Sequence, residues 1–209
     1  MTFLTPDPSE KRPSAEVITS MWNELEVVSM PLTNDRFEQV LTALGSCYSN
    51  GGAKFVRFGL KPHPVLRWFA SRQSLRQSTM GIDFIPKFLM LSMVSEILEQ
   101  IGLSCPVISD SLLEQGSAFT LDGELAQLLR NGGAYPNDAF KGTDREAKAH
   151  GQVFCAELFG DRYSEISMFR SYAAWSSWFV DDNEIWNKSW FGFDTRFFSF
   201  WILALTDSD

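Results

Sequence analysis

The chain has 209 residues, of which 44% are hydrophobic and 14% aromatic, so it can bury a sizeable core and suits one large domain better than two. The formal net charge is −8 at pH 7, with a pI of about 4.8. This balance argues against a general affinity for nucleic acid or anionic membrane surfaces, and it favours a basic protein as partner.

The cysteine content and the lengths of the apolar segments indicate the cellular compartment in which the protein is expected. Cys47, Cys105 and Cys155 are odd in number and widely spaced, without a CxxC pair. We therefore expect no disulfide framework and no structural zinc site, and we expect no cofactor. The N-terminus lacks a secretory signal, and the longest uncharged apolar runs fall short of the roughly 20 residues that span a bilayer. We expect a soluble cytoplasmic protein.

The first elements in chain order are a leader and two helices. Prolines among polar residues predict that residues 1–13 form a flexible N-terminal leader, followed by a single globular α+β domain over residues 14–209. Helical spacing of apolar residues predicts a helix from Ser14, as N-cap, through Val28. A second helix is expected over residues 35–44, ended by Gly45.

The middle of the chain predicts a strand and two more helices. Turn residues at 50–52 precede a strand around residues 55–58, and residues 65–78 follow as a short helix. Residues 85–103 are apolar on most of a helical circumference, with Pro86 near the first turn. We expect one long, central, buried helix there.

The last third changes from helices to strands. A helix is expected from Thr120 to a glycine pair at 132–133, and another begins with a capping box at Thr143 and closes at Gly160. Strand signals follow at residues 165–169, 178–180, 186–193 and 196–206. The pattern predicts an α+β fold, with a mostly helical N-terminal two-thirds packed on a C-terminal antiparallel β-sheet that ends in a β-hairpin.

The predicted hairpin gathers acidic residues. A two- or three-residue turn beginning at Asp194 gives paired residue numbers that sum to 389 or 390. Both registers bring together five carboxylates: Asp181, Asp182, Glu184, Asp207 and Asp209. Like charges facing each other need water or a cation, so the cluster is interpreted as a divalent-metal site, a patch for basic groups of a partner, or a solvated sheet end.

The tryptophans in this region have two interpretations. Trp175, Trp178 and Trp186 are candidates for a partner surface, because aromatic residues are enriched at the centres of interfaces. Trp190 and Trp201 are expected in the core, where large rings bury the most area.

Residues 54–87 carry seven basic residues against one acidic residue, the reverse of the whole chain. Arg72 and Arg76 share a helix face there and could hold a phosphate or carboxylate, since guanidinium groups bind such anions through paired hydrogen bonds. A solvated helix surface that pairs with the acidic remainder is the alternative. Sequence motifs of nucleophilic, nucleotide-binding or zinc enzymes are absent.

The sequence therefore favours a non-enzymatic acidic protein-binding module, of the inhibitor or immunity type, that neutralises a basic partner. Its expected surface combines the three tryptophans with the acidic cluster. Two alternatives stay open. One is a metal-dependent hydrolase that uses the carboxylates, with the two arginines holding an anionic substrate. The other is a structural or assembly subunit that forms a homo-oligomer.

Overall fold

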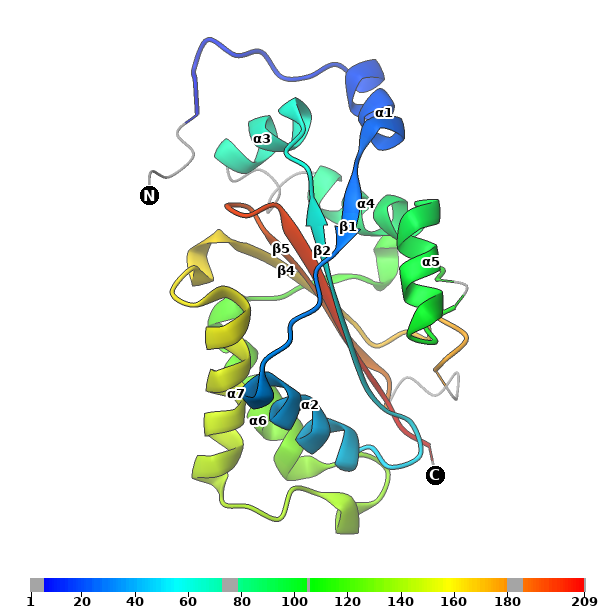
Figure 1. Ribbon diagram of the computed structural model, residues 1–209, viewed down its shortest axis with the longest axis vertical. Helices are drawn as coiled ribbons and strands as arrows, with labels where there is room; N and C mark the ends of the chain where they lie inside the picture. Colours follow the sequence, from blue (N-terminus) through cyan, green and yellow to red (C-terminus); the bar gives the residue numbers. More distant parts are fainter. Residues whose placement is uncertain (1–5, 73–78, 105, 180–185, 209) are drawn as a thin grey trace.

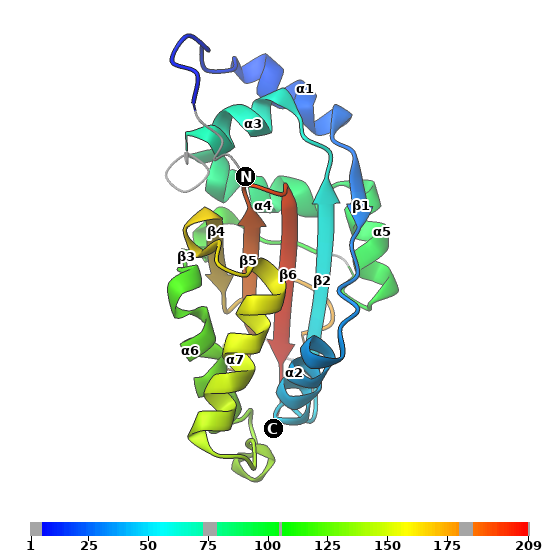
Figure 2. The same ribbon diagram turned by 60° about the vertical axis from the view of Figure 1, so that its left-hand side comes forward.

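A central antiparallel sheet forms the middle layer of the protein, with helices on both of its faces (Figures 1 and 2). The computed structural model describes residues 6–72, 79–104, 106–179 and 186–208. The strand order is β1-β2-β6-β5-β4-β3. The strands are β1 Val27–Ser29, β2 Gly52–Leu60, β3 Glu114–Gln115, β4 Ile166–Ser171, β5 Lys188–Asp194 and β6 Ser199–Thr206. The α+β class and the C-terminal hairpin of β5 and β6 are confirmed.

One face of the sheet is covered by four helices and an aromatic core. The helices are α1 Ala15–Glu24, α3 Pro64–Ser71, α4 Thr79–Leu89 and α5 Ser92–Gln100. The ring of Phe88 lies 4.6 Å from Phe200 of β6 and 5.3 Å from Phe58 of β2, measured between centroids. Tilted and edge-to-face contacts of this kind add to the burial of the rings, so the sheet and α4 share one core.

The opposite face carries three helices that begin at clear capping residues. They are α2 Asp35–Ser46, α6 Ala118–Asn131 and α7 Asp144–Phe159. Their N-caps, Asn34, Ser117 and Thr143, each accept a hydrogen bond from a backbone N–H of the first turn. The capping box between Thr143 and Glu146 is present as predicted. Trp190 and Trp201 lie in the core on this face, which confirms the expectation for both.

The predicted helix through Val28 is wrong at its C-terminal end. Helix α1 ends at Glu24, and Leu25 adopts an extended conformation. Val27 and Val28 then pair with β2 as part of the edge strand β1. Backbone pairing with the sheet and the β-branched side chains outweigh the helical spacing of the apolar residues.

The predicted single helix over residues 85–103 is also wrong. Two helices occupy this region, because α4 begins at Thr79 and ends at Leu89, and α5 begins at Ser92. Pro86 therefore lies inside α4 and lacks the N–H that a helix interior uses. The junction residue Met90 is 78% exposed, and α5 buries only its Val94 and Leu98 face, so this segment is not a central buried helix.

The register of the hairpin differs from both predictions. Asp194 pairs with Ser199, and Lys188 pairs with Leu205, so paired residue numbers sum to 393. A four-residue turn causes the difference: Oδ1 of Asp194 accepts hydrogen bonds from the backbone N–H groups of Arg196 and Phe197. The strand predicted at residues 178–180 is also wrong where it is described, because Trp178 lies in a turn.

Candidate functional site

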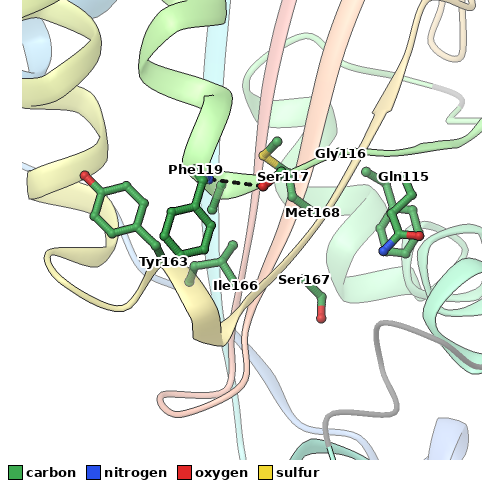
Figure 3. A pocket seen from close by; sticks show the side chains of 10 residues that line it. Gln115, Gly116, Ser117, Phe119, Tyr163, Ile166, Ser167 and Met168 are labelled. Carbon is green, nitrogen blue, oxygen red and sulfur yellow. Dashed lines mark hydrogen bonds between the residues drawn. The ribbon is translucent and has the colours of Figure 1, made fainter.

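A cavity of about 180 Å³ opens at the edge of the sheet, where β3 ends and α6 begins (Figure 3). Two short segments line it, one on each side. They are residues 115–119, from the end of β3 to the first turn of α6, and Tyr163 with residues 166–169, from the start of β4. Residues far apart in the sequence therefore form this site.

The edge of β4 is open beside the cavity. Strand β3 pairs with β4 through two residue pairs only, Glu114 with Arg170 and Gln115 with Phe169. The last backbone hydrogen bond on this side runs from Gly116 N–H to the carbonyl of Met168, at 2.9 Å. Since the chain then turns into α6, the first residues of β4 have no strand neighbour on this side within the described part of the chain. An unpaired strand edge is a ready template for another extended chain.

Two aromatic rings form one wall of the cavity. Phe119 is 67% exposed, and its ring stacks on Tyr163 with centroids 5.5 Å apart and an interplanar angle of 26°. Tyr163 is held from behind by an edge-to-face contact with Phe159 at 5.0 Å. Figure 3 shows both wall rings on the same side of the cavity. Phe119 therefore presents a large apolar surface on a fixed support.

A buried hydroxyl group without a hydrogen-bond partner also lines the cavity. Ser167 is 4% exposed, and its Oγ has no partner among the described residues. Its neighbours Ile166 and Met168 point into the core under α6 and α7, so Ser167 lies on the other face of the strand. An unsatisfied buried hydroxyl costs about 1–3 kcal/mol, which a bound polar group would recover.

Two aspartates, Asp122 and Asp161, lie near Tyr163 of the cavity wall. Burial raises the pKa of Tyr163, and the negative potential of nearby groups, including Asp122 and Asp161, raises this pKa further. Asp122 is paired with Lys148 at 2.8 Å, whereas the exposed Asp161 has no ion-pair partner among the described residues. The Asp161 carboxylate near Tyr163 is therefore available to a cationic group.

Of the three tryptophans predicted to form a partner surface, one is buried and two are partly exposed. Trp175 is 1% exposed, and its Nε1 donates a hydrogen bond of 2.7 Å to Ser189 Oγ. This burial removes Trp175 from any partner surface. Trp178 is half-buried, with the Lys54 ammonium 4.4 Å from the centre of one of its rings. Trp186 is partly exposed.

The predicted acidic cluster can be followed only at Asp207, which is 1% exposed. The carboxylate of Asp207 accepts hydrogen bonds from the backbone N–H groups of Asn50, at 2.9 Å, and Ala134, at 2.8 Å. It therefore ties the end of β6 to two turns. The other four members lie outside the described residues: Asp181, Asp182, Glu184 and Asp209. Within the described ranges, no group of three or more His, Cys, Asp or Glu side chains could hold a metal ion.

Of the two arginines predicted to bind anions, Arg72 is described and Arg76 lies outside the described residues. Arg72 stacks on Trp68, 4.3 Å from the ring centre, and donates hydrogen bonds to the carbonyls of Asp7 and Glu10. Its guanidinium group thus holds the N-terminal segment against α3.

The described cysteines occupy the core under α2, α6 and α7. Cys47 and Cys155 are both fully buried free thiols. Burial raises the pKa of Cys155 to about 12, so this thiol stays protonated at neutral pH. Cys105 lies outside the described residues.

No protein-family model matches the sequence, and a comparison with curated proteins gives no match. None of the helices in the described part of the chain is both long and apolar enough to cross a membrane. The site must therefore be interpreted from its own chemistry. Sequence reasoning missed Phe119 and Ser167, although Phe119 carried a signal: it falls off the apolar face that Leu121, Leu125 and Leu128 give to α6.

Proposed function

We propose that this chain is a non-enzymatic protein-binding module that holds a basic, extended segment of a partner polypeptide along the open edge of β4. The narrowest form of the proposal is an inhibitor or immunity-type protein that neutralises a basic partner in the cytoplasm. The partner class agrees with the charge of −8. The surface is the sheet-edge cavity, in place of the buried Trp175 region.

The observation that carries the proposal is the unpaired buried hydroxyl of Ser167 beside an open strand edge. An extended peptide brings a backbone N–H or C=O every residue, and it can pair with an edge strand while a polar atom meets a hydroxyl in the cavity. The same cavity offers Phe119 and Tyr163 as a wall for an apolar side chain. The open edge of β4, the rings of Phe119 and Tyr163, and the Ser167 hydroxyl together fit one extended peptide.

The negative charge near the site favours a partner segment with positively charged side chains. Alternate side chains of an extended peptide point in opposite directions, so one set can contact the aromatic wall while the other reaches the rim. Asp161 near Tyr163, together with the net charge of the chain, favours lysine or arginine in the partner segment. Complementary charge accelerates encounter and disfavours acidic partners.

The test uses short fluorescent peptides of alternating lysine and valine, with glutamate–valine peptides of the same length as the charge control. We expect fluorescence anisotropy to show binding of the lysine peptide and weaker binding as salt increases, because exposed charges are screened. Phe119→Ala should weaken binding by about tenfold or more, the effect of losing an aromatic anchor. Tyr135→Ala removes a ring that is 42% exposed elsewhere, and should leave binding unchanged.

Two results would contradict the proposal. One is equal binding of the acidic and basic peptides, which would remove the electrostatic argument. The other is unchanged affinity of the lysine peptide for the Phe119→Ala variant, which would place binding at another surface.

A further inference from the structure

Three arginines and two carboxylates gather near the turn between β5 and β6, at the end of the sheet away from α2 (Figure 2). We call this group the arginine cluster. It consists of Arg57 on β2, Arg162 after α7, Glu165 before β4, Asp194 at the end of β5 and Arg196 in the turn. The cluster carries one positive charge more than it has negative charges, in a chain whose net charge is −8.

Both carboxylates of the cluster already have partners. Asp194 Oδ2 accepts hydrogen bonds from Arg162 Nε, at 3.0 Å, and Nη2, at 2.9 Å. Its Oδ1 accepts from the backbone N–H groups of Arg196 and Phe197. The two carboxylate oxygens of Glu165 accept hydrogen bonds from Arg196 Nε, at 2.5 Å, and Nη2, at 2.6 Å. The ion pairs Arg162–Asp194 and Arg196–Glu165 therefore use both negative charges of the cluster.

Arg57 is the cation that remains. Its Nη2 donates one long hydrogen bond of 3.4 Å to Ser199 Oγ, and its buried Nε has no partner among the described residues. Burial lowers the pKa of Arg57, while Asp194 raises it and Arg162 lowers it. The guanidinium is thus partly desolvated, and within the described ranges it forms no ion pair of its own. A charge in this position costs stability unless an opposite charge meets it.

The sheet itself does not require an arginine here. Arg57 pairs with Trp201, so its side chain projects from the same face as that ring, which belongs to the core under α2, α6 and α7. Phe55, two residues earlier on the same face, packs against this core. An apolar side chain at position 57 would extend the apolar face formed by Phe55 and Trp201. A charged side chain there therefore points to a ligand rather than to packing.

We propose that Arg57 binds a small oxyanion, either a phosphate group or a carboxylate group. Planar guanidinium donors match the oxygens of both groups, and Arg57 is partly exposed, so an anion can reach it. The Nη–H groups of the partly exposed guanidinium would gain charge-assisted hydrogen bonds to the anion. This site is separate from the sheet-edge cavity and does not depend on the peptide-binding proposal.

The test compares thermal unfolding of the full chain in sodium phosphate, sodium acetate and sodium chloride at one pH and ionic strength. We expect phosphate or acetate to raise the melting temperature with saturation, by mass action on the folded state. Arg57→Met should melt higher than the wild type in chloride, because an uncompensated charge is gone, and should lose the saturable rise. Arg145→Met, an exposed arginine of α7, is the control and should keep the wild-type response.

Each other outcome overturns the proposal. A rise that persists in Arg57→Met reflects the general effect of salts on burial. Absence of any saturable rise in the wild type with both anions means that no site exists. If Arg57→Met does not fold, the Nε–Hε NMR signals of the wild type decide the question: a saturable shift of the Arg57 signal with phosphate supports the site, and an unmoved signal overturns it.

Discussion

The helix pair α6–α7 and the helix pair α4–α5 lie on opposite faces of the same sheet but are held in different ways. Helices α6 and α7 lie side by side along their lengths (Figures 1 and 2), and Gly151 of α7 meets the backbone of Asp122 in α6. In the other pair, Phe84 and Phe88 of α4 make tilted ring contacts with Phe200 of the sheet. One pair depends on close contact between backbones, and the other on rings that reach the sheet.

The two faces of the sheet are therefore sensitive to different substitutions. A side chain added between α6 and α7 must push two helices apart, whereas a ring removed beneath α4 leaves a void against the sheet. The adjacent residues Phe200 and Trp201 of β6 point to opposite faces and belong to the two cores. We therefore expect the two cores to unfold together, although each is damaged by a different kind of substitution.

The largest effects are expected from removing one ring on each face. Phe88 contacts Phe200, and Phe154 contacts Trp201, with both mutated rings fully buried. Each change to Ala should lower the free energy of unfolding by about 3–5 kcal/mol, from lost burial and the cavity left behind. Urea unfolding monitored by circular dichroism and by tryptophan fluorescence measures this.

Met90→Ala is the control for this pair, because Met90 is 78% exposed and its change should cost less than about 0.5 kcal/mol. A single coincident transition is expected for both phenylalanine variants. Two separate transitions in either variant would mean that the faces unfold independently, and the comparison would then describe two subdomains.

A smaller effect tests the contact between α6 and α7. A Cβ atom at Gly151 would lie 2.1 Å from the Asp122 carbonyl oxygen, closer than any real contact. Gly151→Ala should therefore cost about 1–3 kcal/mol as the helices separate or bend. The measurement is the free energy of unfolding in urea.

Gly123 of α6 supplies a matched control, because the nearest atom to an added Cβ there is the flexible Lys148 Nζ, at 3.5 Å. Gly123→Ala should stabilise the protein by about 0.5–1 kcal/mol, since alanine loses less conformational entropy in a helix than glycine does. If both alanines had the same effect, the close contact between the backbones would not matter for stability.

Local signals were correct at both ends of α7 but not at the end of α2, where Gly45 was expected to stop the helix and instead lies inside it. The capping box at Thr143 and the glycine at 160 bound α7 as predicted, because caps act within one turn. The segment around Pro86 failed, because its apolar residues fit one long helix as well as two, and the position of the break depends on contacts with the sheet. The register of the hairpin failed because Asp194 binds the backbone of its own turn and lengthens it.

The candidate site shows the same limit more strongly. Phe119 and Ser167 meet at one cavity although 48 positions separate them in the chain, and no local motif records that meeting. Arg57 was counted in the basic segment, but its lack of a carboxylate follows from how Asp194 and Glu165 pair in three dimensions. The two core tryptophans of β5 and β6 were predicted correctly because a large ring on a strand beside a helical layer contributes much buried area.

The smallest expected effect concerns the start of α7, compared with the start of α5. The Thr143 Oγ1 accepts the Glu146 N–H at 3.2 Å, and the Glu146 carboxylate accepts the Thr143 N–H at 2.7 Å. Thr143→Ala removes the first of these bonds and should cost about 1 kcal/mol, whereas Thr143→Ser keeps it and should be nearly neutral. Helix α5 has no side-chain cap, and the hydroxyl of the exposed Ser92 at its start makes no hydrogen bond with a described residue. Ser92→Ala should therefore change the free energy of unfolding by less than about 0.5 kcal/mol. If Ser92→Ala were as costly as Thr143→Ala in urea unfolding, local capping would not distinguish the two helix pairs.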